Sequence, residues 1–258
     1  MSDHAPTVAR DTEPVSEAQI EVRRADQRFR TEADWVTSRS LFSFGEHYDP
    51  ANTGFHSLLV SNDEVVRPGP GYADHPHADS EIITWVLSGS LVHADSAGHT
   101  GVVHPGLAAR MSAGSGIVHA ERNDAYLLDP TRAPEPVHFV QMWVRPDVAG
   151  TVPTYRQSEF ALTDLHTDWL PVASGHHPDA VVDLGNAGAT FWVAVLGPGV
   201  ARVLPAGAYV HLYLARGEVE VETVGRLRTG DSLRITGEAG LAVTGVDEAE
   251  LLVWVIAR

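Results

Sequence analysis

Two short segments of the chain, His75-Pro76-His77 and His119-Ala120-Glu121, place metal-binding side chains on alternate residues. In a β-strand, positions i and i+2 project from the same face of the sheet. Each segment therefore offers a pair of ligands to one side of a sheet. Three imidazoles and a carboxylate suit iron, manganese, nickel, copper or zinc, and they do not select one of these metals.

The composition narrows the chemistry that these residues can perform. The chain has no cysteine, which excludes disulfides, thiolate zinc sites and cysteine catalysis. Its 34 acidic and 18 basic residues give a formal charge of -16, which repels phosphate backbones, so we expect no direct nucleic-acid binding. No apolar run approaches the roughly 18 residues that span a membrane, and the N-terminus lacks a signal-peptide core. We expect a cytoplasmic protein without membrane association.

The elements that must position these ligands are predicted to be strands. Residues 1–20 are read as a mobile tail because they contain almost no large apolar side chains. The rest of the chain alternates short apolar runs with Gly, Pro, Asn and Asp, for example at residues 57–60, 82–87, 137–144 and 191–196. This pattern predicts an all-β sandwich or barrel fold.

An internal repeat predicts two β-domains, a first at residues 21–154 and a second at 155–258. Residues 209–219 resemble residues 82–91, which sets Gly217 against Gly89, and residues 251–256 resemble 139–144, which sets Trp254 against Trp143. The same alignment sets non-ligating residues against all four ligand positions. The pairs are Val203 with His75, Pro205 with His77, Val243 with His119 and Gly245 with Glu121. We therefore predict one metal centre, in the first domain.

Further motifs extend the similarity beyond the ligand pairs. The spacing of Gly69, His75-x-His77, Glu81 and Gly89, and later of Gly114, Gly116, His119 and Asn123, resembles the two motifs of the cupin superfamily. Longer phrases resemble the pirin family in particular. They are Ser43-Phe44-Gly45, Tyr48-Asp49-Pro50, Glu81-Ile82-Ile83-Thr84, His93-Ala94-Asp95-Ser96, Met111-Ser112-Ala113-Gly114 and Gly116-Ile117-Val118-His119.

The pirin resemblance implies a bicupin, with two tandem jelly-roll barrels and one metal ion in the first. It implies that His75, His77, His119 and Glu121 bind a divalent metal, with Fe(II) expected first and Mn, Ni, Cu or Zn as alternatives. It further implies dioxygenase activity of the quercetin 2,3-dioxygenase type on a small aromatic substrate such as a flavonol, with Glu121 as the catalytic base. The competing function is that of a non-catalytic iron-binding regulator, whose surface responds to the oxidation state and contacts a protein partner.

Several residues have a second interpretation. Strand parity places Glu81 on the face of His75 and His77, and other cupins use this glutamate as a ligand. The pirin pattern uses Glu121 instead and leaves Glu81 as a carboxylate that either supports the ligands or is structural. Trp85 shares that parity and is expected in the core or lining the pocket, and Gln141 is expected to face either a buried partner or a substrate. We expect solvated loop positions for the histidines of the next segment, His93, His99 and His104.

The chain departs from the family pattern near the expected pocket. Ala78, Ser80, Ala94 and Leu107 stand where charged or bulky residues are common in pirins. These changes remove positive charge while the metal ligands are kept. Substrate preference is therefore less predictable than metal binding.

Overall fold

The computed structural model describes residues 18–129, 131, 133–237 and 240–257. Residues 1–17 of the predicted tail lie outside this range, whereas Gln19 and Ile20, which were predicted to belong to the tail, begin the paired strand β1 (Gln19–Arg23). The described part is almost entirely β-structure in four sheets, with three short 3₁₀-helices, η1 (Ala25–Gln27), η2 (Ala125–Leu127) and η3 (Leu162–His166). It contains no helix long and apolar enough to cross a membrane.

The N-terminal half is built from a seven-stranded and a four-stranded sheet. The larger sheet has the order β12-β9-β6-β11-β4-β3-β2. Its strands are β2 (Phe29–Glu32), β3 (Val36–Ser40), β4 (Leu58–Val66), β6 (Glu81–Ser88), β9 (Leu107–Ser112), β11 (Val137–Val144) and β12 (Thr154–Glu159). The smaller sheet, β5-β10-β7-β8, contains β5 (Gly71–His77), β7 (Leu91–Asp95), β8 (Thr100–Val103) and β10 (Ile117–Arg122).

The C-terminal half repeats this arrangement. Its larger sheet has the order β1-β20-β17-β22-β15-β13-β14. Its strands are β1 (Gln19–Arg23), β13 (Leu170–Ser174), β14 (Val182–Asp183), β15 (Ala189–Leu196), β17 (Tyr209–Arg216), β20 (Ser232–Thr236) and β22 (Ala249–Ile256). The smaller sheet, β16-β21-β18-β19, contains β16 (Ala201–Val203), β18 (Glu218–Val221), β19 (Gly225–Arg228) and β21 (Ala242–Gly245). The matching strand orders confirm the predicted all-β bicupin fold.

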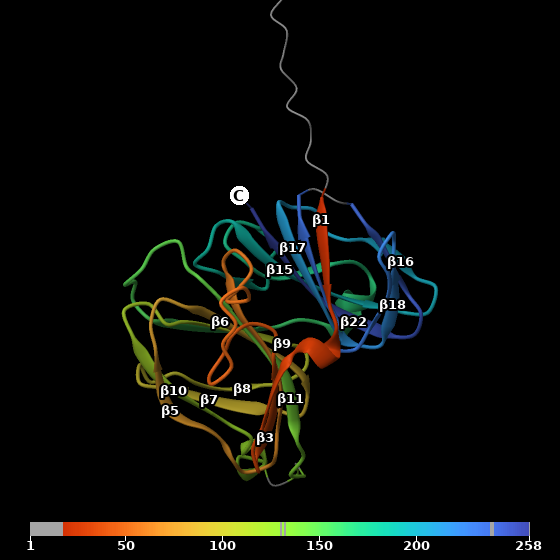
Figure 1. The fold of residues 1–258 in the computed structure, drawn as a ribbon. Coiled ribbons are helices and arrows are strands. Elements are labelled where there is room, and N and C mark those ends of the chain that lie inside the picture. Colours follow the sequence, from red (N-terminus) through yellow and green to blue (C-terminus); the bar gives the residue numbers. More distant parts are fainter. Residues whose placement is uncertain (1–17, 130, 132, 238–239, 258) are drawn as a thin grey trace, which may run out of the picture.

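Each half contributes a strand to the other's side of the molecule. Strand β1, red in Figure 1, pairs with β20 beside the blue strands of the C-terminal half. Strand β12, which follows the linker, pairs with β9 of the N-terminal half. Sheet membership therefore crosses the domain limit at residues 154–155 that the repeat predicts.

The turn after the central strand of each half depends on glycine. Gly89 follows β6 with φ +74°, and Gly217 follows β17 with φ +79°, which is a left-handed conformation that side chains disfavour. A Cβ at Gly89 would also lie 2.7 Å from the carbonyl oxygen of Pro136, and one at Gly217 would lie 2.3 Å from that of Glu248. The two predicted repeat glycines thus occupy equivalent turns for the same steric reason.

The predicted match of Trp254 with Trp143 is wrong by one residue. When Gly217 is set against Gly89, His211 corresponds to Ile83. Trp254 pairs with His211, whereas Met142 pairs with Ile83, so Trp254 is equivalent to Met142. Because adjacent residues of a strand face opposite sides, Trp254 points between the halves, where its Nε1 contacts Met142 Sδ at 3.1 Å.

The central strands are buried on both faces. In β6, Ile83, Trp85 and Leu87 join a buried cluster that both halves share, together with Phe191 and Trp254. The alternate residues of the same strand, including Ile82 and Val86, pack inside the N-terminal barrel. A third cluster fills the C-terminal barrel. The metal-ligand candidates lie in the first barrel, on the smaller sheet that is turned away from the shared cluster.

Candidate metal centre

The structure brings the three predicted histidines together on neighbouring strands. His75 of β5 pairs directly with His119 of β10. His77 lies two residues after His75 in β5 and projects from the same face. The ring centroids are 4.4 Å apart for His75 and His119, 4.8 Å for His75 and His77, and 4.9 Å for His77 and His119. One nitrogen from each ring lies within 4.8 Å of the other two.

The orientation of these rings fits a metal ion. His75 Nδ1 lies 2.8 Å from the carbonyl oxygen of Ala73, which leaves its Nε2 free. Among the described residues, the buried Nε2 atoms of His77 and His119 have no hydrogen-bond partner. Buried polar nitrogens without a partner are costly, and a cation shared by all three would satisfy them.

The protonation states also favour metal binding. Burial, and then the neighbouring His75, lowers the pKa of His77 to about 4. Burial, with smaller contributions from His75 and His77, lowers the pKa of His119 to about 3. Both rings are neutral at neutral pH, and the neutral imidazole is the form that binds a metal.

Glu121 lies behind His119, at a register shift between β10 and β5. Its carboxylate forms a possible ligand group with His93 and His119, and not with His75 and His77. Both carboxylate oxygens accept hydrogen bonds from the Gln141 amide, at 2.9 and 2.8 Å. Burial raises the pKa of Glu121 to about 7, although hydrogen bonds from Gln141 and Thr84 lower it. The role of Glu121 as fourth ligand stays a prediction.

Gln141 has a protein partner at the site. Its amide nitrogen binds Glu121, and its oxygen accepts a hydrogen bond from Trp143 Nε1 at 3.1 Å. The Trp143 ring in turn stands edge-on to His77, with centroids 4.7 Å apart and planes at 79°. Gln141 thus connects the buried carboxylate to an aromatic wall of the histidine cluster.

Glu81 lies outside this arrangement, and the parity argument that placed it there is wrong. A turn separates β5 from β6, and the two strands belong to different sheets, so the alternation of one does not continue into the other. Glu81 instead accepts hydrogen bonds from Ser112 Oγ at 2.7 and 2.8 Å and from the Gly185 amide at 3.1 Å. Trp85 shares this face and belongs to the shared cluster. It also lines the larger pocket between the two halves, so it lies both in the core and at a pocket, although not at that of the histidines.

His93 is the residue that sequence reasoning missed. We expected a solvated loop position, but His93 lies in β7 with 3% of its surface exposed, and its Nδ1 is 3.4 Å from His119 Nδ1. The alternation of His93 and Asp95 was the available signal, because it resembles that of the metal-binding pairs. His99 lies in the turn after β7, with 39% of its side chain exposed, as expected.

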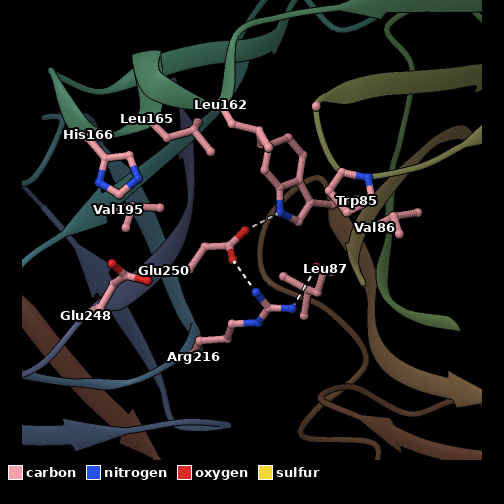
Figure 2. Close-up of a pocket in the computed structure, with 12 residues that line it drawn as sticks. Trp85, Val86, Leu87, Leu162, Leu165, His166, Val195, Arg216, Glu248 and Glu250 are labelled. Carbon is pink, nitrogen blue, oxygen red and sulfur yellow. Dashed lines mark hydrogen bonds and ion pairs between the residues drawn. The ribbon is translucent and has the colours of Figure 1, made fainter. Parts of the chain in front are cut away.

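Two cavities differ in their relation to the histidines. The barrel interior behind His119 leaves only about 10 Å³, lined by Thr84, His93, Glu121 and Tyr155 among others. A larger pocket of about 260 Å³ lies between the two halves and contains none of the candidate ligands. Figure 2 shows Glu250 at its centre, bonded to Trp85 Nε1 at 2.7 Å and facing Arg216.

Known proteins are similar to this chain in both sequence and fold. The family model described as Pirin matches residues 21–144. A Mycobacterium tuberculosis protein named "putative quercetin 2,3-dioxygenase" is 45% identical over 238 residues, which cover 92% of this chain and 95% of the relative. The quercetin 2,3-dioxygenase of Escherichia coli is 31% identical and covers 91% and 97%. The crystal structure of the E. coli pirin YhhW with nickel(II) has a TM-score of 0.82 at 30% identity, covering 93% of this chain and all of that one.

Proposed function

Because the chain belongs to the pirin family, we propose that its N-terminal barrel holds one divalent metal ion. We further propose that the protein is a cytoplasmic cupin dioxygenase that acts on a flavonol such as quercetin. The observation that carries this proposal is the convergence of His75, His77 and His119, two of which present buried nitrogens without a partner. The names of the relatives support the reaction class, and the nickel in the E. coli pirin supports the presence of a metal.

The three Nε2 atoms would hold the metal, and we propose Glu121 as the fourth ligand. Glu121 adjoins His119, and its carboxylate is already oriented by the Gln141 amide. Fe(II) is the proposed native ion, with Mn, Ni, Cu and Zn as alternatives for the same donors. Bound Fe(II) would supply redox chemistry with dioxygen and a Lewis-acid position for a substrate oxygen.

The protein itself would bind the substrate, remove its proton and keep water away from the reacting atoms. A carboxyl group whose pKa is about 7 can accept a hydroxyl proton near neutral pH, which is the step that we assign to Glu121. Gln141 would orient this base, since its amide contacts both carboxylate oxygens.

Substrate must approach from the outer side of the histidine cluster. The space of about 10 Å³ behind His119 is too small for a flavonol, whereas His75 and His77 are only half-buried. Tyr72 lies 6.0 Å from His75, and Trp143 lies 4.7 Å from His77, between ring centroids. These aromatic side chains would pack against a planar aromatic ligand.

The proposal is tested by metal analysis followed by turnover. The purified protein is expected to contain close to one equivalent of a first-row metal, and His75→Ala combined with His119→Ala should abolish it. Glu81→Gln is the matched control, because Glu81 is a buried carboxylate outside the site and should leave the metal content unchanged. Full metal retention in the double variant would refute the site.

Activity is measured with the anaerobic Fe(II) protein mixed with quercetin and then exposed to air. We expect catalytic loss of the flavonol absorbance with uptake of dioxygen. Stoichiometric or absent loss would refute the dioxygenase. If a partner protein were then recovered with only one oxidation state of the iron, the regulatory function would replace it.

A further inference from the structure

A chain of hydrogen bonds leads from His119 to the protein surface. His119 Nδ1 lies 3.4 Å from His93 Nδ1, and His93 Nε2 lies 3.2 Å from Asp95 Oδ2. Asp95 in turn faces His99 Nδ1 at 3.1 and 3.0 Å through its two oxygens. His93 and Asp95 have side chains that are 4% and 0% exposed, whereas that of His99 is 39% exposed.

Metal binding at His119 would fix the direction of the two inner bonds, from His119 to His93 and from His93 to Asp95. If Nε2 of His119 binds the metal, the ring proton is on Nδ1, which then donates to His93 Nδ1. His93 therefore carries its own proton on Nε2 and donates it to Asp95. A neutral imidazole has one donor and one acceptor, so His93 is used completely in this arrangement.

Other contacts hold the inner part of the chain in place. The His93 ring is stacked on Tyr155, with centroids 4.3 Å apart and planes at 6°. Asp95 Oδ1 accepts hydrogen bonds from the backbone amides of Ala97 at 2.9 Å and His99 at 3.0 Å. These bonds would keep Asp95 ionised although its side chain is buried.

We propose that His93 and Asp95 are positioning residues that hold His119 in its metal-binding tautomer and transmit the negative charge of Asp95 to the metal. The inference rests on the proposed metal centre and adds two residues that contact neither metal nor substrate. A carboxylate that supports a metal-bound histidine raises the basicity of that ligand. Here the His93 imidazole lies between the Asp95 carboxylate and His119, and the negative charge of Asp95 should favour the higher oxidation state of bound iron.

The test uses Co(II) as the probe, with affinity measured by competition against a chelator in the full-length protein. His93→Leu removes the acceptor for His119 and is expected to weaken Co(II) binding by roughly 10- to 100-fold, the range typical of such supporting residues. His93→Asn places an amide oxygen near the former Nδ1, so it should restore much of this affinity while remaining disconnected from Asp95. His104→Leu is the control and should bind Co(II) as the wild type does.

The contribution of the charge is tested with Asp95→Asn. This variant and His93→Asn should both raise the Fe(III)/Fe(II) reduction potential and alter the visible spectrum of bound Co(II), whereas His104→Leu should do neither. A merely structural role for Asp95 would lower the thermal stability without moving the potential. A His93→Leu variant that is folded by circular dichroism and binds Co(II) within twofold of the wild type would overturn the proposal, and so would a folded Asp95→Asn variant with an unchanged reduction potential.

The outcomes separate this proposal from the proposed reaction. If the wild type binds Co(II), the affinities change as expected and quercetin is not consumed, then the chain from His119 to Asp95 stands and the dioxygenase fails. If quercetin is consumed and the variants behave as the wild type does, the dioxygenase stands and this proposal fails. If the wild type binds no Co(II), both the metal centre and the proposal are overturned.

Discussion

His211 gives the sharpest prediction about stability. Its ring is 1% exposed between the two halves and lies 6.2 Å from Phe42 and 6.5 Å from Phe55, between centroids. Neither ring nitrogen has a partner among the described residues. Burial, followed by the charges of Arg234 and Arg28, lowers the pKa of His211 to about 3. The folded protein therefore keeps this histidine neutral under conditions in which the unfolded chain protonates it.

The sign and size of the effect follow from linkage. Between pH 6.5 and about 3 the unfolded state binds one proton more at this residue than the folded state, so the free energy of unfolding falls as the pH falls. At pH 5.0 the unfolded histidine is 1.5 pH units below its ordinary pKa of about 6.5, and at 1.36 kcal/mol per unit the loss is about 2 kcal/mol. At pH 7.5 the loss is close to zero.

The perturbation is His211→Leu, which has a similar volume and cannot be protonated. Urea denaturation of the metal-free protein at pH 7.5 and 5.0, at constant ionic strength, gives the free energy of unfolding for each variant. The wild type should lose about 2 kcal/mol more than His211→Leu between these two pH values. His176→Leu, an exposed position, should follow the wild type.

The stability at pH 7.5 provides a second measurement. Removal of a buried polar ring without hydrogen-bond partners should leave the protein at least as stable as the wild type. Equal losses of free energy in the wild type and in His211→Leu between pH 7.5 and 5.0 would refute the reasoning. So would a cost above about 2 kcal/mol at pH 7.5, because it would mean that the ring makes a polar interaction after all.

Three further substitutions test separate parts of the structure. Trp85→Phe removes the hydrogen-bond donor to Glu250, a largely buried carboxylate in the other half of the molecule. The free energy of unfolding in urea should therefore fall by about 1.5–3 kcal/mol. An unchanged value would contradict a stabilising role for this hydrogen bond. Gln141→Leu removes both amide bonds to Glu121 and so raises the pKa of that carboxyl group. The acidic limb of the kcat/KM profile for quercetin should therefore move to higher pH. A move to lower pH would exclude Glu121 as the base. Gly89→Ala forces a side chain into a left-handed turn against a carbonyl oxygen, and a loss in Tm should follow, while an unchanged Tm would show that the turn can relax.

Local spacing was enough to predict the two same-face ligand pairs and the repeated fold, whereas the meeting of the two pairs at one site was implied by the resemblance to the pirin family. His75 and His77 share a face because they lie in one strand, and His119 joins them because β10 pairs with β5 and sets His119 opposite His75. The repeat was identified by aligning the turn glycines Gly89 and Gly217, and both occupy backbone conformations that other residues disfavour. The shared face of His75 and His77 and the turn glycines concern single strands or single turns, where short-range rules hold.

The errors all involve relations between strands, which spacing does not encode. Alternation was continued from β5 into β6 to place Glu81, although the turn between them leads to another sheet. His93 was assigned to a loop although its alternation with Asp95 was visible, because spacing does not show that β7 pairs with β10. Trp254 was matched to Trp143 by residue type, whereas the register sets it against Met142.

The two barrels differ in what fills them, and this difference bears on how the protein is stabilised. The C-terminal barrel is filled by leucine, isoleucine and valine side chains, such as Leu212 and Leu233. The N-terminal barrel also buries polar groups, among them Glu64 and Glu121, and burial raises the pKa of each to about 7. Folding must offset the free-energy cost of burying these polar groups, and a cation that binds only the folded state would offset part of that cost. The metal should therefore stabilise the first barrel by an amount that grows with the logarithm of its affinity, while the packing of the second barrel needs no such contribution.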